Sequence, residues 1–254
     1  MVPAIIIAKG HSNRLPHKNI LPFCGLPLVE WSIIQASSAH LIDKVFLSTD
    51  SEHIAEIGRK YNAEIIWRKS KVGEEVSGGY VVTYALRELQ KKYDFDVFCS
   101  LLPTSPCREP NDIDRAVKAF NENKRNITRL SALYCPKEMT VYEKVTWRTD
   151  GNYYFPVIWN KNYRYLNGNS NVYISYVNNY LNLLSKPEGD NAIDLRWEVY
   201  GIPENGIAGY IEIEWYQQFD IDDKDDFEFC EILMERYILK GRGPEIYKQY
   251  ARSK

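Results

Sequence analysis

The chain has 254 residues, of which 44% are hydrophobic, and its formal net charge is −2 at neutral pH. This length fits one large domain, or one domain with an elaborated lobe, and the apolar content suffices for a sizeable core, so we do not expect a disordered chain. The small net charge argues against a general nucleic-acid-binding or membrane-surface protein. No apolar run approaches the ~18 residues of a membrane helix, so we expect no nucleic-acid partner and no membrane partner.

The five cysteines are odd in number, and no two of them have C-x-x-C spacing. We therefore expect neither a disulfide framework nor a zinc centre. The N-terminus lacks a charged segment followed by a long apolar stretch, which is the pattern of a secretory signal. These features together predict a protein of the reducing cytoplasm.

Short apolar strands alternate with helical segments through the first half of the chain. The predicted strands are 3–8, 44–48, 63–67 and 97–102, and the predicted helices are 28–39, 51–61, 79–92 and 110–121. This alternation is typical of a mostly parallel sheet with right-handed crossovers. We therefore predict an α/β, Rossmann-like fold with helices on both faces of the sheet. In such folds ligands bind at the carboxyl ends of the strands.

The second half differs, because short Tyr-rich segments of alternating polarity replace the strand–helix alternation. After a strand at 130–135, we predict hairpins from the segments 140–147, 152–158 and 171–176, with turns at Asp150-Gly151 and Asn167-Gly168. A strand at 210–213 and a helix from 225 to about 239 follow. We interpret the chain as one domain, 1–254, with an inserted β-rich lobe at about 136–205 that forms a lid or a subunit contact.

A loop rich in cations follows the first strand. It contains Gly10 and the charged side chains of Lys9, Arg14 and Lys18. A glycine lets backbone approach a ligand closely, and the N–H groups of such a turn form a concave anion site. Lys and Arg are the usual partners of phosphate. An ordinary basic surface loop is the alternative, but dense charge directly after a buried strand favours polyphosphate binding.

Polar clusters also follow the other three predicted strands of the first half. They are Ser48-Thr49-Asp50, Arg68 and Pro103-Thr104-Ser105-Pro106-Cys107-Arg108. The carboxyl ends of parallel strands meet at one edge of a sheet. We therefore expect these clusters and the basic loop to converge on one rim.

An acidic turn near the end of the chain has five carboxylates in the seven positions 220–226. Asp220 and Asp222 are two residues apart, so an extended backbone points both to one side, where they can bind Mg²⁺. Asp223 and Asp225 fall in the first turn of the next helix, and we interpret them as a helix cap. Helix capping is the alternative role for all the carboxylates of this turn. The predicted polyphosphate loop nevertheless favours a metal at Asp220 and Asp222, because Mg²⁺ commonly bridges phosphates and carboxylates.

These motifs resemble those of the acylneuraminate cytidylyltransferases, the CMP-sialic acid synthetase type of nucleotide-sugar cytidylyltransferase. The family opens with a strand and then about A-R-x-x-S-K-G-x-x-x-K-N, which this chain matches at Ala8, Ser12, Lys18 and Asn19. The family's S-T-D appears as Ser48-Thr49-Asp50, and its Arg after the third strand appears as Arg68. Its P-T-S-P-x-R appears at 103–108, and its D-I-D-x-x-x-D appears as Asp220-Ile221-Asp222 with Asp226. The resemblance covers residues 3 to about 125 and about 205 to 235.

The chain departs from the family pattern at several positions. Lys9 replaces an Arg, Asn13 and Arg14 replace Lys and Gly, and Leu102 replaces a Gln implicated in cytosine contact. The segment from about 136 to 205, where the family binds its sugar and dimerises, matches poorly. These departures bear on the choice of base and sugar acid rather than on nucleotidyl transfer itself.

The resemblance implies a nucleotidyltransferase fold of the GT-A-like type and a homodimer. It implies that a hydroxyl of a sialic-acid-like keto-sugar acid attacks the α-phosphorus of CTP, which gives a CMP-sugar and pyrophosphate. Catalysis is assigned to Lys18, Asp220 and Asp222, and the two aspartates are assigned to Mg²⁺. The implied nucleotide-binding residues are Ala8, Lys9, Gly10, Ser12, Asn13, Arg14, Lys18, Asn19, Arg68, Pro103 and Thr104.

Three other interpretations stay open. One is a nucleotidyltransferase with another base or acceptor, and another is a non-catalytic nucleotide-binding module. The third is a metal-dependent glycosyltransferase, whose Asp-x-Asp motif has a counterpart in Asp94-Phe95-Asp96. That motif precedes the fourth strand, however, at the end opposite to the expected site. Pyrophosphate release from a nucleoside triphosphate separates the module and the glycosyltransferase from our first choice.

Overall fold

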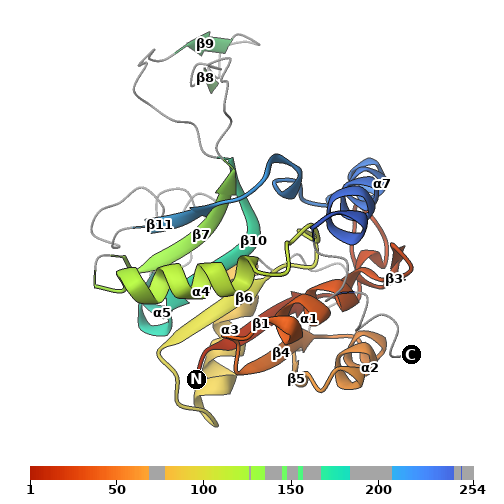
Figure 1. Ribbon diagram of the computed structural model, residues 1–254. Helices are drawn as coiled ribbons and strands as arrows, with labels where there is room; N and C mark the ends of the chain where they lie inside the picture. Colours follow the sequence, from red (N-terminus) through yellow and green to blue (C-terminus); the bar gives the residue numbers. More distant parts are fainter. Residues whose placement is uncertain are drawn as a thin grey trace.

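The computed structural model describes residues 1–68, 78–125, 127–134, 145–147, 154–156, 167–183, 208–242 and 247. A seven-stranded sheet with the order β11-β7-β10-β6-β1-β4-β5 forms its centre (Figure 1). The strands are β1 (Pro3–Ala8), β4 (Lys44–Thr49), β5 (Glu64–Trp67), β6 (Val97–Leu101), β7 (Arg129–Tyr134), β10 (Asn167–Tyr176) and β11 (Ala208–Glu212). Neighbouring strands pair in parallel except at β10, which is antiparallel to both β6 and β7. The predicted mostly parallel α/β fold is confirmed.

Helices pack on both faces of this sheet. They are α1 (Leu28–Ser38), α2 (Glu52–Lys60), α3 (Gly78–Gln90), α4 (Asp112–Asn123), α5 (Val177–Leu183) and α7 (Lys224–Leu233). The sequence predicted one helix from 225 to about 239, whereas α7 changes at Met234 into the π-helix η4 (Met234–Arg242). Further short elements are the 3-10 helices η1 (Lys18–Ile20) and η3 (Trp215–Gln217), and the strands β2 (Pro22–Phe23) and β3 (Leu26–Pro27). In the part of the chain that the structure describes, no helix combines the length and the apolar character that crossing a membrane requires.

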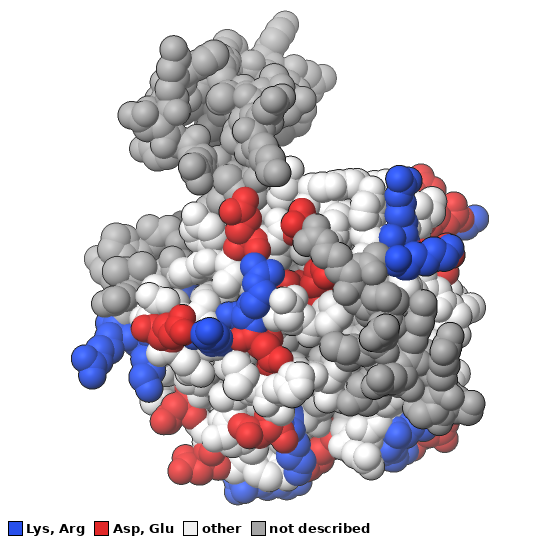
Figure 2. All heavy atoms as spheres, in the orientation of Figure 1, with Lys and Arg blue, Asp and Glu red and all other residues white. Residues whose placement is uncertain are grey.

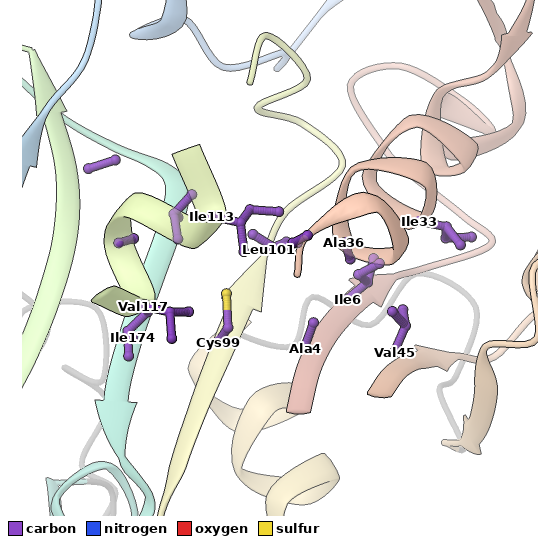
Figure 3. Close-up of a cluster of buried hydrophobic side chains, with 14 of the residues drawn as sticks. Ala4, Ile6, Ile33, Ala36, Val45, Cys99, Leu101, Ile113, Val117 and Ile174 are labelled. Carbon is purple, nitrogen blue, oxygen red and sulfur yellow. The ribbon is translucent and has the colours of Figure 1, made fainter. Parts of the chain in front are cut away.

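The alternation of side chains along β1 explains why helices are needed on both faces. Ala4 and Ile6 pack with Ile33 of α1 in one buried cluster, to which α2 and α4 also contribute (Figure 3). Ile5 points the other way and packs with Leu86 of α3 in a second cluster. All five side chains are fully buried. Successive residues of a strand point to opposite faces, so this continuous apolar run needs cover on both.

Helix α1 is buried against two layers at once. Its residues Val29 and Ile33 face the sheet, while Leu28, Trp31 and Ile34 face a third cluster that includes residues of α7 and η4. The last helices of the chain therefore form an outer layer over α1. This packing brings the acidic turn, which begins α7, toward the elements that follow β1 and β6.

One strand of the predicted inserted lobe belongs to the central sheet, so that prediction was wrong for the segment 171–176. Strand β10 lies between β6 and β7, and Asn167-Gly168, predicted as a turn, begins this strand. Apolar and polar residues alternate in the same way in a hairpin strand and in a strand of a large sheet, so the sequence pattern could not distinguish the two. The predicted hairpin before it is present as β8 (Val145–Trp147) paired antiparallel with β9 (Tyr154–Pro156). The rest of the predicted lobe lies outside the described residues.

Charged side chains of both signs are interspersed on the face of the molecule shown in Figure 2. Lys and Arg side chains alternate there with Asp and Glu side chains, and no large region of that face has a single sign. This distribution agrees with the small net charge of the sequence. The described Lys and Arg side chains therefore form no broad basic surface on this face.

Gly58 of α2 marks a place where the packing leaves no room for a side chain. A Cβ atom at Gly58 would lie 2.6 Å from Cδ2 of Leu47 and 3.0 Å from Cδ1 of Ile65. Overpacking costs roughly 1–3 kcal/mol, and the better helix propensity of alanine offsets up to about 1 kcal/mol. We expect Gly58→Ala to lower the free energy of unfolding by about 1–2 kcal/mol in urea denaturation. Glu56→Ala, at an exposed position of the same helix, is the control, and equal stability of both variants would contradict the packing.

Candidate active site

A pocket of about 750 Å³ lies at the carboxyl ends of β1, β4, β5 and β6. The loop after β1 lines it with residues 9–15 and 17–20, and the end of β4 contributes Asp50 and Ser51. Arg68 follows β5, and residues 102–104 follow β6. The predicted convergence of these clusters on one rim is confirmed.

Most residues predicted from the sequence line this pocket: Lys9, Gly10, Ser12, Asn13, Arg14, Lys18, Asn19, Arg68, Pro103, Thr104 and Asp222. Two others lie beside it. Ala8 is buried at the end of β1, and the Asp220 carboxylate accepts a hydrogen bond from the Ser105 hydroxyl. The pocket is also lined by residues that were not among the predicted site residues: Ile7, His11, Leu15, His17, Ile20, Asp50, Ser51, His53, Gly78, Val81 and Leu102. Of these, Asp50 had a signal in the sequence, since it ends the S-T-D motif.

Hydrogen bonds hold the loop after β1 in one conformation. The Gly10 N–H donates to Asp50 Oδ1 at 2.7 Å, and Asn19 Nδ2 donates to the Lys9 carbonyl oxygen at 2.8 Å. His17 has the left-handed backbone conformation (φ 57°), which is uncommon for a residue with a side chain. Its Nδ1 lies 3.2 Å from the Gly10 carbonyl oxygen. The ends of the loop are therefore tied together, with its cations around the pocket.

Lys18 is the buried cation of this loop. Its ammonium donates a hydrogen bond to the Ile221 carbonyl oxygen at 2.5 Å. Burial lowers the pKa of Lys18 from its ordinary value, the nearby Asp222 carboxylate opposes this shift, and Arg14 and Lys9 add to it. Titratable groups perturbed by burial and by specific charges are concentrated at functional sites. Lys18 is therefore placed where the charge of a ligand would be felt strongly.

The acidic turn is joined both to the loop after β1 and to the segment after β6. The Ile221 N–H donates to the Thr104 carbonyl oxygen at 2.7 Å. Arg14 Nη1 lies 2.8 Å from Asp222 Oδ2, and these side chains are 69% and 53% exposed. The Asp223 carboxylate accepts an N–H of the first turn of α7, which confirms its predicted capping role. Asp222 is thus the carboxylate of this turn that faces the pocket.

Arg68 lines the pocket at the end of β5, on the far side of β4 from the basic loop. Its buried Nε–H has no hydrogen-bond partner among the described residues. Burial lowers the pKa of its guanidinium, and Asp50 opposes this shift. Because a buried unpaired donor is unfavourable, this N–H is suited to a ligand acceptor. Ile7, Val81 and Leu102 add apolar surface to the same pocket.

Arg108 fixes the segment after β6 from inside the protein, where it is fully buried. Its guanidinium donates to the carbonyl oxygens of Leu102, at 2.8 Å, and of Asn171. It also donates to the Gln35 side chain at 2.9 Å and to the Ser32 hydroxyl at 3.2 Å. Burial lowers the pKa of Arg108 to about 10, which leaves the group charged at neutral pH. One cation thus joins α1, β10 and the end of β6.

Solved structures of nucleotidyltransferases have the same fold. CMP:2-keto-3-deoxy-manno-octonic acid synthetase complexed with CTP has a TM-score of 0.69 at 18% identity, over 93% of this chain and 99% of that chain. A cytidylyltransferase from Leptospira borgpetersenii has a TM-score of 0.65 at 17% identity, over 99% of this chain and 94% of that chain. The sheet and its pocket therefore define a protein of the nucleotidyltransferase fold.

The sequence profile of the family described as "Cytidylyltransferase" matches residues 3–240, and the chain belongs to this family. N-acylneuraminate cytidylyltransferase A of Danio rerio is 32% identical over 122 residues, which are 48% of this chain and 28% of that protein. Pseudaminic acid cytidylyltransferase of Campylobacter jejuni is 35% identical over 122 residues, 47% of this chain and 53% of that protein. CMP-N,N'-diacetyllegionaminic acid synthase of Legionella pneumophila is 30% identical over 133 residues, 51% of this chain and 57% of that protein.

These relatives confirm the resemblance that the sequence motifs indicated. The chain spans about half or less of the length of two of them, and 57% of the third. In each comparison the matched part is about half of this chain.

Loss of the Arg108 guanidinium would leave the carbonyl groups of Leu102 and Asn171 without this donor. We expect Arg108→Met to lower the free energy of unfolding by roughly 2–5 kcal/mol, because each buried acceptor left unsatisfied costs about 1–3 kcal/mol. Chemical denaturation measures the effect. Arg125→Met makes the same change at an exposed position and should stay near the wild type. A loss for Arg108→Met no larger than for this control would contradict the central role of the guanidinium.

Proposed function

We propose that this protein is a CTP-dependent nucleotidyltransferase that activates a sialic-acid-like keto-sugar acid as its CMP derivative and releases pyrophosphate. The observation that carries the proposal is the pocket itself, where the cations Lys9, Arg14 and Lys18 of one loop face Asp222 of the acidic turn. The names of the relatives, which refer to N-acylneuraminate, pseudaminic acid and diacetyllegionaminic acid, support the acceptor class.

The basic loop would bind the triphosphate. Lys18 is held by the neutral Ile221 carbonyl, so its positive charge stays available and its position is fixed before the ligand arrives. A fixed charge of this kind stabilises the negative charge that develops on the leaving pyrophosphate. In the reaction the acceptor hydroxyl oxygen forms a bond to the α-phosphorus, the bond to the bridging oxygen breaks, pyrophosphate leaves, and the hydroxyl proton is released to solvent.

Asp222 fits a role as ligand of Mg²⁺, with Asp220 as the second carboxylate. Mg²⁺ is commonly held by one or two carboxylates together with substrate phosphates. Among the described residues no group of three or more potential ligands stands together, so phosphate oxygens and water would complete the coordination. The half-exposed pair with Arg14 is a weak interaction, which leaves Asp222 available. A bound ion would offset the charge of the triphosphate and favour ionisation of the attacking hydroxyl.

Arg68 would contact the nucleoside through its Nε–H, which has no partner among the described residues, beside the apolar side chains of Ile7, Val81 and Leu102. The Asp94-Phe95-Asp96 motif precedes β6 and so lies at the amino end of that strand, away from the pocket. This position does not favour a glycosyltransferase.

A cytoplasmic homodimer is part of the proposal, supported by the family resemblance and the cysteine pattern.

Pyrophosphate release tests the reaction directly. We expect release with Mg²⁺, CTP and one member of a panel of keto-sugar acids, and weaker or no release with ATP, GTP or UTP. Removal of the Lys18 ammonium should lower the rate by about a hundredfold or more, since a lost cationic contact costs a few kcal/mol in the transition state. Lys18→Ala is therefore compared with Lys118→Ala, at an exposed position of α4. Near-normal turnover of Lys18→Ala would refute this assignment.

Asp222→Asn tests the metal assignment, because it keeps the shape of the side chain and removes its charge. We expect the Mg²⁺ concentration for half-maximal activity to rise about tenfold or more, as expected from a lost charge-assisted contact. Asp225→Asn, an exposed residue of the same helix start, should leave the metal dependence unchanged. Chelation of divalent ions should abolish activity in every variant. Identical Mg²⁺ titrations of the two variants would exclude Asp222 as a ligand.

A further inference from the structure

At each end of the paired strands β1 and β4, an aspartate next to β4 accepts a hydrogen bond from a backbone N–H next to β1. At the amino end, Asp43 Oδ2 accepts the Val2 N–H at 2.6 Å. At the carboxyl end, Asp50 Oδ1 accepts the Gly10 N–H at 2.7 Å. The first contact is exposed, whereas Asp50 lines the pocket. The chain therefore contains two similar contacts, one at the candidate site and one at the opposite end of the same strands.

The contact at the pocket has a second partner. Arg68 Nη2 lies 3.8 Å from the same oxygen, Asp50 Oδ1. The side chains of Arg68 and Asp50 are 10% and 14% exposed, so water screens their attraction less than at the surface. One carboxylate oxygen thus faces both the backbone of the basic loop and the guanidinium that follows β5.

Gly10 packs so closely against the end of β4 that a side chain at this position would displace the loop. A Cβ atom at Gly10 would lie 2.7 Å from Cβ of Ser51 and 3.5 Å from Asp50 Oδ1. Ser51 is itself fixed as the N-cap of α2, where its Oγ accepts the Ile54 N–H at 3.4 Å. The absence of a side chain at Gly10 is therefore what lets the loop reach the Asp50 carboxylate.

We propose that Asp50 is a positioning residue of the nucleotide site. Its carboxylate fixes Gly10 of the triphosphate-binding loop and orients Arg68, and so sets the spacing between the two groups that bind opposite parts of the nucleotide. The inference rests on the proposed function, because it takes the ligand to be a nucleoside triphosphate. Without Asp50, the loop and Arg68 still bind their own parts of the ligand, but the advantage of binding both in one prearranged geometry is lost.

Calorimetric titration of the whole chain with CTP, with tripolyphosphate and with CMP separates positioning from direct contact. We expect Asp50→Ala to weaken CTP binding about tenfold or more, the size expected for a hydrogen bond to a charged group. Tripolyphosphate lacks the nucleoside, and CMP keeps only one of the three phosphates, so each engages the two sides together less than CTP does and its affinity should fall less than about threefold. Asp50→Asn keeps an acceptor oxygen for the Gly10 N–H and should recover part of the loss.

Asp43→Ala is the matched control, since it removes the equivalent N–H acceptor at the end of the strands away from the pocket. Its CTP affinity should equal that of the wild type. Gly10→Ala, which must displace the loop from Ser51, should reproduce the loss seen for Asp50→Ala.

The proposal is overturned if Asp50→Ala binds CTP as the wild type does. It is also overturned if CTP and both fragments weaken equally, because this is the result expected of a general structural role. Should Asp50→Ala fail to fold, Asp50→Asn decides, and wild-type CTP affinity in that variant excludes a role for the charge. The proposed function is tested separately by pyrophosphate release from the wild type. CTP binding without release would refute the reaction but would leave the Asp50 comparison valid. Absence of binding to any of the four triphosphates overturns both.

Discussion

The Arg108 guanidinium donates hydrogen bonds to α1, to β10 and to the end of β6 at the same time. A buried cation is very unfavourable unless its donors are satisfied, so these three elements can shift only together. The Leu102 carbonyl, one of the acceptors, begins the segment that lines the pocket. The Tyr247 hydroxyl donates to the Arg108 carbonyl oxygen at 3.3 Å, which ties the last described residue into the same centre. The rigidity of this side of the pocket thus follows from the need to satisfy one charge.

The cations of the pocket differ in how the protein holds them, and this difference suggests different roles. Lys18 contacts a neutral carbonyl, so its field acts on whatever occupies the pocket. Arg14 contacts the Asp222 carboxylate at the surface, an interaction that a phosphate or a metal ion can replace. Arg68 lies between these extremes, since it is buried near Asp50 and its Nε–H has no partner in the part of the chain that the structure describes. The pocket lining has four cationic and two anionic side chains, so the pocket keeps a net positive charge although Arg14 and Arg68 already lie near carboxylates.

Local patterns were enough to predict much of this molecule. The alternation in β1 and the charges that follow it required no knowledge of distant residues, so the sheet, the pocket and Lys18 could all be predicted. The place of β10 could not, because alternation tells which residues share a face and not which strand lies beside it. Asp50 belongs to a motif that the sequence shows, but its positioning role could not be predicted, because that role depends on a glycine forty positions earlier. The pairing of Arg14 with Asp222 likewise joins residues that only the folded chain brings together.

Strands β7 and β10 are neighbours in the sheet, and their register pairs Tyr134 with Asn167. The chain therefore leaves the sheet and returns to it at two points about 5 Å apart, the spacing of an antiparallel pair. Because the entropy of closing a loop rises only slowly with its length, the sheet places little restriction on what connects these two residues. In evolutionary terms, the stretch 135–166 can be lengthened, shortened or exchanged while the strand ends that form the pocket keep their places. The strand ends that form the pocket and the stretch 135–166 are thus free to diverge at different rates.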